Sequence, residues 1–284
     1  MRVLVLGATG MLGNAMLRML SADERLTVTG TARAGEARKR LGDELADKLL
    51  TGVDAQNPDS LAAVLATVRP SIVINCVGVV KQLAAGKEVL AAVPINTLLP
   101  HRLAQLCAVA DSRLIHFSTD CVFAGTKGNY VETDRADATD VYGLSKFLGE
   151  VAEPNAITLR TSMIGHELAS KRSLIDWFLS QQGTVRGFTR AVFSGLPTVE
   201  LARIVRDFII PGPKLSGLYH VSAAPIDKFT LLRMVGEVYG HGVEIVPDDA
   251  LAIDRSLDST RFRTATGYVP PTWPDLVARM REFG

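Results

Sequence analysis

Residues 2–13 read RVLVLGATGMLG, an apolar run that leads into a glycine-rich turn. The run ending before Gly7 predicts a buried parallel strand, and the pattern from Met11 onward predicts a helix. A glycine-rich turn placed between such a strand and such a helix is the position at which a dinucleotide binds. The stretch therefore predicts an α/β fold with a dinucleotide site at its first turn.

Each glycine of this turn has a separate use. Gly7 allows the tight turn, Gly10 leaves room for a pyrophosphate, and Gly13 lets the helix pack on the strand. The first N–H groups of the helix then face the phosphates. The alternative is a structural glycine-rich turn without a ligand. The residues of this motif that we predict to bind the cofactor are Gly7, Thr9, Gly10, Met11, Leu12 and Gly13.

The N-terminal half alternates short apolar runs with helical patterns, which indicates repeated βαβ units. Strands are expected at Arg2–Leu6, Thr27–Thr31, Leu49–Asp54, Ile72–Asn75, Arg113–Ser118 and Ala156–Arg160. Helices are expected to begin near Met11, Gly35, Pro58, Ile95 and Val141. We expect a doubly wound Rossmann sheet with a parallel arrangement, in which residues 1–160 form the dinucleotide-binding domain.

The pattern becomes irregular after Arg160. The expected elements are a helix at residues 174–181, a glycine-rich segment at 183–195, a helix from Val199, a strand near 217–221, and helices from Lys228 and Trp273. We expect residues 161–284 to form a smaller C-terminal cap that is mainly substrate-binding. A return of some of these elements to the Rossmann sheet is left open.

Charge and composition exclude several classes of protein. The chain has 284 residues, with 31 Lys and Arg against 30 Asp and Glu, so its net charge of +1 gives no surface for a nucleic acid. Its 3 cysteines and 5 histidines show neither a disulfide framework nor the spacing of a metal site. No apolar stretch approaches the roughly 18 residues of a membrane span. We therefore expect a cytoplasmic protein with no membrane partner and no metal-ligand residues, and a requirement for a divalent metal is left open.

Arg33 follows the second expected strand, where the adenosine ribose of a dinucleotide lies. A carboxylate at this position indicates NAD, whereas an arginine accommodates the 2′-phosphate of NADP. Because this position holds an arginine and no acid, the sequence predicts NADP(H). The alternative is an exposed loop arginine. Asp54, at the end of the third expected strand, either accepts a hydrogen bond from the adenine amino group or caps the following helix.

Tyr142 and Lys146 lie four residues apart and share one face of an expected helix. A free phenol has a pKa of about 10, and a nearby fixed cation brings that pKa toward the working range of a proton donor. The alternative is the ordinary surface of an amphipathic helix. Ser118 and Thr119 end the strand that precedes this helix, so their hydroxyls are expected in the ligand crevice.

With these motifs the chain resembles the extended short-chain dehydrogenase/reductase family. Within that family it is most similar to the dTDP-4-dehydrorhamnose reductase-like group of nucleotide-sugar 4-ketoreductases. The resemblance rests on residues 7–13, 75–78, 118–125, 142–150 and 159–162, and so spans nearly the whole chain.

The resemblance implies a reduction of a sugar C4 ketone by NADPH. Thr119 would hydrogen-bond the carbonyl, Tyr142 would donate the proton, and Lys146 would lower the pKa of Tyr142 and hold the nicotinamide ribose. Further cofactor contacts are implied for Asn75, Cys76, Val77, Gly78 and Ser118. Asn96 would help to order the site, although Asn75 and Asn96 are alternatively satisfied buried polar groups.

The implied substrate is a dTDP- or UDP-linked 4-keto-6-deoxy sugar used for polysaccharide precursors, and a homodimer is left open. The candidate substrate residues are Asn96, Asp120, Val122, Phe123, Arg186 and Arg255. Arg186 is alternatively an exposed loop arginine. Cys121 departs from the tyrosine usual in dehydrorhamnose reductases and from the glutamate of 4,6-dehydratases, so a dehydratase is disfavoured.

Two other functions are weighed against this one. The first is a nucleotide-sugar epimerase with tightly bound NAD, which the lack of an acid at position 33 disfavours. The second is a non-catalytic NADP-binding regulatory or sensing subunit. Such a subunit would be expected to lose the catalytic residues, and here Thr119, Tyr142 and Lys146 are all present.

Overall fold

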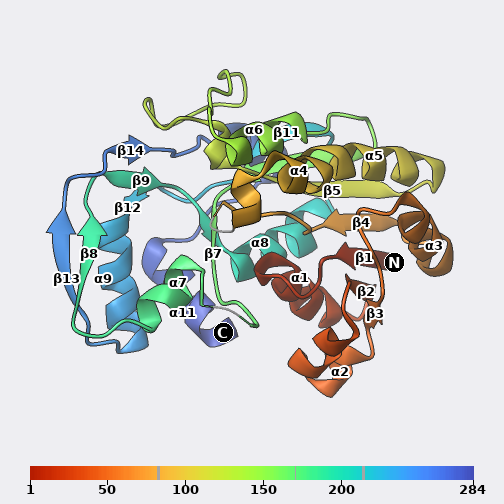
Figure 1. Ribbon diagram of the computed structural model, residues 1–284, viewed down its shortest axis with the longest axis horizontal. Helices are drawn as coiled ribbons and strands as arrows, with labels where there is room; N and C mark the ends of the chain where they lie inside the picture. Colours follow the sequence, from red (N-terminus) through yellow and green to blue (C-terminus); the bar gives the residue numbers. More distant parts are fainter. Residues whose placement is uncertain (82–83, 170, 213–214) are drawn as a thin grey trace. The chain divides into compact units, whose positions relative to one another are not determined.

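The computed structural model describes residues 1–81, 84–169, 171–212 and 215–284 (Figure 1). Its contacts divide the chain into two compact units, and neither is a continuous segment. The first comprises Met1–Ser118, Thr139–Leu159 and a short segment that ends at Leu218, and the second comprises Thr119–Ala138, Arg160–Gly212 and Tyr219–Gly284. The chain therefore passes between the units at several points and not only near residue 160.

A seven-stranded sheet has the order β11-β6-β5-β4-β1-β2-β3. Its strands are β1 (Arg2–Leu6), β2 (Thr27–Ala32), β3 (Leu49–Thr51), β4 (Ile72–Asn75), β5 (Arg113–Thr119), β6 (Ala156–Thr161) and β11 (Gly217–His220). The neighbours β1–β2, β2–β3, β1–β4 and β4–β5 are parallel. The predicted doubly wound Rossmann sheet is confirmed.

The strand order reverses between β1 and β4, which is where open α/β sheets bind their ligands. The register pairs Leu6 with Asn75, so the carboxyl ends of β1 and β4 are adjacent. Both strands have the predicted bounds, because a parallel strand that is buried on both faces needs a continuous apolar run.

The helices of the first unit differ from expectation in two places. Its helical elements are α1 (Met11–Ser21), η1 (Gly35–Arg40), α2 (Asp43–Ala46), α3 (Pro58–Val68), η2 (Ala84–Lys87), α4 (Val89–Ala92), η3 (Val93–Leu98), α5 (Leu99–Val109) and α6 (Val141–Leu148). The helix expected from Gly35 is a 3₁₀ turn followed by the short α2. The helix expected from Ile95 begins earlier, at Val89, and passes through the π-helical turn η3 before α5.

The third strand is also shorter than expected. It ends at Thr51 and not at Asp54, because Gly52 has a φ of 80° and turns the backbone out of the extended conformation. None of the helices in the described ranges is both long enough and apolar enough to span a membrane.

The second unit contains three small sheets, β10-β7, β12-β9-β14 and β13-β8. Their strands are β7 (Met163–Ile164), β8 (Thr184–Phe188), β9 (Ala191–Phe193), β10 (Leu196–Pro197), β12 (Ile226–Asp227), β13 (Glu244–Asp248) and β14 (Ile253–Asp254). The helical elements are η4 (Asp120–Val122), α7 (Leu174–Leu179), α8 (Thr198–Ile204), η5 (Val205–Ile209), α9 (Lys228–Tyr239), α10 (Thr260–Thr266) and α11 (Trp273–Phe283). The glycine-rich segment at 183–195, expected to be irregular, thus forms β8 and β9.

Candidate active site

The three glycines after β1 are required for different reasons. Gly7 has a φ of 75°, and a Cβ there would lie 3.0 Å from Cγ2 of Val77. A Cβ on Gly13 would overlap the carbonyl oxygen of Gly7 and lie 2.7 Å from its carbonyl carbon. A Cβ on Gly10 would meet only the oxygen of Gly7, at an ordinary 3.5 Å. The fold therefore demands glycine at positions 7 and 13, whereas at position 10 it leaves room for a Cβ.

The N-terminus of α1 lies directly after this turn. Its N-cap is Gly10, which offers no side-chain cap, and the first turn carries no acidic residue. Uncapped N–H groups and the helix dipole favour an anion at this position. Thr9 and Met11 are half-buried, whereas the side chain of Leu12 belongs to the core. Leu12 could therefore contact a cofactor only through its backbone.

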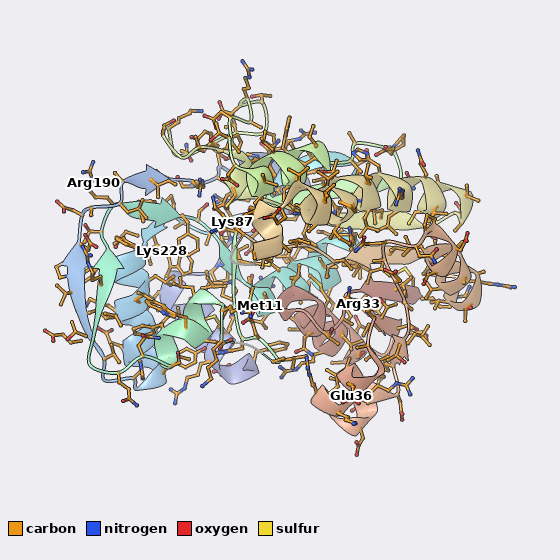
Figure 2. All side chains as sticks on the ribbon, viewed as in Figure 1. Met11, Arg33, Glu36, Lys87, Arg190 and Lys228 are labelled. Atoms are coloured by element: carbon orange, nitrogen blue, oxygen red, sulfur yellow. The ribbon has the colours of Figure 1, made fainter. Side chains whose placement is uncertain are left out.

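Arg33 is exposed directly after β2 (Figure 2). Within the described ranges no hydrogen bond or ion pair involves its guanidinium. Nearby, Arg38 donates to the carbonyl of Leu49 at 2.8 Å, and Lys39 pairs with Glu36 at 3.2 Å. Arg38 and Lys39 are thus held by other groups of this chain, whereas Arg33 remains available for a phosphate.

Asp54 lies three residues beyond the end of β3 and is exposed. Its Oδ1 accepts a hydrogen bond from the N–H of Gln56 at 2.9 Å. The alternative that Asp54 caps the next helix is wrong, because the cap of α3 is Asn57, which accepts from the N–H of Asp59 and Ser60.

Asn75 shapes the turn that follows β4. Its Oδ1 accepts from the N–H of Val77 at 3.1 Å, and its Nδ2 donates to Nδ1 of His116 at 3.2 Å. Burial, and secondly the charge of Lys146, hold the pKa of His116 well below its usual value, so this imidazole is neutral. Asn75 is thus a satisfied buried group. Cys76 and Val77 are half-buried after it, and Gly78 is exposed.

Asn96 connects two parts of the first unit. Its Oδ1 accepts from the N–H of Val79 at 2.9 Å, and its Nδ2 donates to the carbonyl of Val79 at 3.0 Å and to Oγ of Ser145 at 3.1 Å. Asn96 is buried, and it joins the segment after β4 to α6. It is therefore a satisfied buried group that also fixes the helix carrying Tyr142.

Lys146 is buried on α6, and its Nζ donates to the carbonyl of Phe117 on β5 at 2.7 Å. Burial lowers the pKa of Lys146 to about 8, and the charge of Glu150 opposes this shift. Tyr142, one helical turn earlier, is half-buried. An ordinary amphipathic surface would leave the lysine in water, so that alternative does not describe Lys146.

Ser118 and Thr119 end β5, and each hydroxyl has a carboxylate partner. Ser118 donates to Oε1 of Glu150 at 2.6 Å. Thr119, assigned to the second unit, donates to Oδ1 of Asp120 at 3.2 Å and accepts from the N–H of Cys121 at 3.2 Å. Burial raises the pKa of Asp120, while the charges of Arg255 and Lys228 lower it. The hydroxyl of Thr119 is therefore oriented by Asp120.

Arg255 braces the loop that follows β5. Its Nε donates to the carbonyl of Phe123 at 2.7 Å, its Nη2 to that of Ala124 at 3.4 Å, and its Nη1 to Sγ of Cys121 at 3.8 Å. The side chains of Val122 and Phe123 are fully buried in a cluster with Tyr130 and Leu257. Because both side chains are buried, only the backbone of Val122 and Phe123 could contact a substrate.

Two basic residues of the second unit remain to be described. Arg186 was predicted as a substrate residue and forms an ion pair with a carboxylate of the protein, whereas Lys228 was not predicted. Arg186 lies 2.7 Å from Oδ2 of Asp248. Lys228, which Figure 2 labels, is the first residue of α9. Its Nζ lies 4.0 Å from the centroid of the Phe193 ring. A lysine in the first turn opposes the helix dipole, and this signal could have identified it from the sequence. Within the described ranges no cluster of His, Cys, Asp and Glu could hold a metal ion.

The sequence matches a known family along almost its full length. Residues 1–281 match the model of the family described as the RmlD substrate binding domain. The chain is 27% identical to the dTDP-4-dehydrorhamnose reductase of Aggregatibacter actinomycetemcomitans, over 99% of this chain and 99% of that protein. It is 30% identical to the dTDP-4-dehydrorhamnose reductase of Mycolicibacterium smegmatis, over 78% of this chain and 72% of that protein.

The fold is also found among solved structures. The crystal structure of dTDP-4-dehydrorhamnose reductase from Bacillus anthracis in complex with NADP has a TM-score of 0.81 to this chain, at 21% identity, and covers 99% of both chains. At this identity the likeness shows the fold alone.

Proposed function

Because the chain belongs to the RmlD substrate binding domain family, we propose that it uses NADPH to reduce the C4 ketone of a nucleotide-linked 4-keto-6-deoxy sugar. The observation that carries the proposal is the buried Lys146, bound to the carbonyl of Phe117 at 2.7 Å and one helical turn after Tyr142. The relatives named dTDP-4-dehydrorhamnose reductase support the substrate class.

The residues after β1 and β2 fit NADPH. The exposed backbone at Gly10 and the uncapped N-terminus of α1 suit a pyrophosphate, and the uncommitted guanidinium of Arg33 suits a 2′-phosphate. The neighbour from Bacillus anthracis, crystallised with NADP, supports this choice. When bound, the cofactor supplies the hydride that is added to the carbonyl carbon.

The side chains supply the proton and stabilise the developing charge. Tyr142 donates its phenolic proton to the C4 oxygen, and the positive charge of Lys146 stabilises the phenolate that remains. Thr119 donates a hydrogen bond to the same oxygen, for which its hydroxyl must turn away from Asp120. The phenolate then regains a proton from solvent, which completes the cycle.

Replacing Tyr142 with Phe tests this division of roles. We expect turnover of NADPH with a keto sugar to fall about a thousandfold or more, since the proton donor is lost. Binding of NADPH, followed by fluorescence, should stay within a few-fold of the wild type.

Tyr239→Phe is the matched control, since it removes a hydroxyl that lies 2.8 Å from Nε2 of His166. This control should keep its turnover. Wild-type turnover in Tyr142→Phe would contradict the mechanism.

A further inference from the structure

Two adjacent hydrogen bonds join strand β5 to helix α6 and to the turn that follows this helix. Lys146 donates to the carbonyl of Phe117 at 2.7 Å, and the next residue, Ser118, donates to Glu150 at 2.6 Å. Phe117 and Ser118 are neighbours in β5, so these two bonds hold the ammonium of Lys146 and the carboxylate of Glu150 at adjacent points of the strand. The strand thus holds a carboxylate beside the buried ammonium.

The backbone at Glu150 is fixed as well. α6 ends at Leu148, and Glu150 continues the turn with an N–H bond to the carbonyl of Phe147 at 3.1 Å. Between them, Gly149 approaches η3 so closely that a Cβ there would overlap the carbonyl oxygen of Asn96. The position of Glu150 is therefore set by packing and not only by its own side chain.

The groups around Lys146 show why the carboxylate of Glu150 matters for the charge of this lysine. Burial lowers the pKa of Lys146 to about 8, and among the described groups Glu150 raises it. His116 on β5 is neutral, because burial holds its pKa well below the usual value. His101 on α5 contacts the carbonyl of Leu148 at 2.8 Å, and Tyr142 lies on α6 itself. Neither of these two imidazoles supplies a negative charge.

We propose that Glu150, oriented by Ser118, is a positioning residue that keeps Lys146 protonated and directed along β5. Lys146 then stays mostly protonated at neutral pH and presents its positive charge to Tyr142. This inference rests on the proposed function, in which Tyr142 and Lys146 act as the proton-donating pair.

Two substitutions separate a charge effect from a structural one. Glu150→Gln keeps an oxygen that can accept from Ser118 and removes the negative charge. Ser118→Ala keeps the charge and removes the donor that orients it. A brace without an electrostatic role would leave the pKa of Lys146 unchanged in Glu150→Gln.

The first measurement is made on the full chain without substrate. Protein labelled with ¹³C at lysine Cε is titrated by NMR, and the Lys146 signal is assigned from its loss in Lys146→Arg. Glu150→Gln should lower the pKa of Lys146 by about one unit, and Ser118→Ala by less. Glu24→Gln, at an exposed position, should leave it unchanged.

An unchanged pKa of Lys146 in Glu150→Gln would overturn the proposal. If that variant does not fold, Ser118→Ala decides alone: a lowered pKa supports the proposal, and an unchanged one overturns it.

The second measurement is the pH profile of kcat/KM with NADPH and a keto sugar. In Glu150→Gln its alkaline limb should move to lower pH by the same amount as the pKa of Lys146. A changed pKa with an unmoved profile would support the electrostatic role of Glu150 and contradict the proposed role of Lys146 in turnover. The two failures are therefore distinguishable.

Discussion

The glycine turn after β1 and the loop after β5 belong to different units, and they differ in whether their candidate binding groups are already hydrogen-bonded to the protein. In the first region, position 10 has room for a Cβ, and Arg33 keeps an uncommitted guanidinium. In the loop, Thr119 is bound to Asp120, and Arg255 donates to three partners. Among the described residues, a ligand at the first region would displace no hydrogen bond of Arg33, whereas a ligand at the second would have to exchange existing hydrogen bonds.

The largest effect should come from Gly13→Ala. The new Cβ would overlap backbone atoms of Gly7 that cannot move without breaking the turn, so we expect a loss of about 3 kcal/mol in the free energy of unfolding. Urea unfolding measures this loss.

Gly10→Ala is the matched control for that substitution. It should change stability by less than about 1 kcal/mol and still weaken the binding of NADPH, because the space it fills belongs to the ligand. Equal stability losses in the two variants would remove the distinction between the glycines.

Low pH should lower the free energy of unfolding through His220, which binds the backbone of the segment after β5. His220 is fully buried, its Nδ1 donates to the carbonyl of Tyr130 at 3.0 Å, and burial lowers its pKa from 6.5 to about 4. Between these values the unfolded chain binds a proton that the folded chain does not, so stability falls as pH falls from about 6.5 to about 4.

Protonation of His220 lowers the free energy of unfolding by at most about 3 kcal/mol over this pH range. Below the pKa of His220 in the folded chain, this group causes no further loss. Urea unfolding of the wild type and of His220→Gln at about pH 7 and about pH 4.5 measures it. A stability difference between the two pH values that is the same in both proteins would exclude His220 as its source.

Arg255→Ala should loosen the loop directly. Loss of the three donations to residues 121–124 should lower stability by about 2 kcal/mol and raise hydrogen exchange in the loop. Arg255→Lys should restore little, because one ammonium cannot reproduce the guanidinium fork. Full recovery in the lysine variant would indicate that only the charge matters.

The smallest effect is expected for Arg33→Ala. Affinity for NADPH should fall about tenfold, and affinity for NADH should change little, since the lost contact is to the 2′-phosphate. Arg40→Ala, at an exposed arginine on η1, serves as the control and should alter neither affinity. Equal losses for both cofactors would contradict the assignment of NADP.

The central strands could be predicted because their burial on both faces imposes a simple pattern. The bounds of β1 and β4 follow from continuous apolar runs. The strand β8 could not be found this way, since its residues alternate between exposed and buried within a glycine-rich segment. Gly187 there is not a loop residue, because a Cβ would lie 2.9 Å from Cα of Phe229 on α9. Packing, and not turn formation, requires that glycine.

The site was predictable where a motif is local and less so where partners come from distant segments. The spacing of Tyr142 and Lys146 indicated their shared helix face, and Lys146 is indeed buried there. The partners of Arg255 lie more than one hundred residues earlier, so its bracing role has no local signature. For the same reason the sequence gives no indication that Ser118 orients Glu150, which only the packing of β5 on α6 reveals.

The most direct test is a fluorescence titration of the purified chain with NADPH and with NADH, with and without dTDP- and UDP-linked 4-keto-6-deoxy sugars. The account predicts tighter binding of NADPH, and oxidation of NADPH only after one of the keto sugars is added. Binding without oxidation for every sugar, or a preference for NADH, would contradict it.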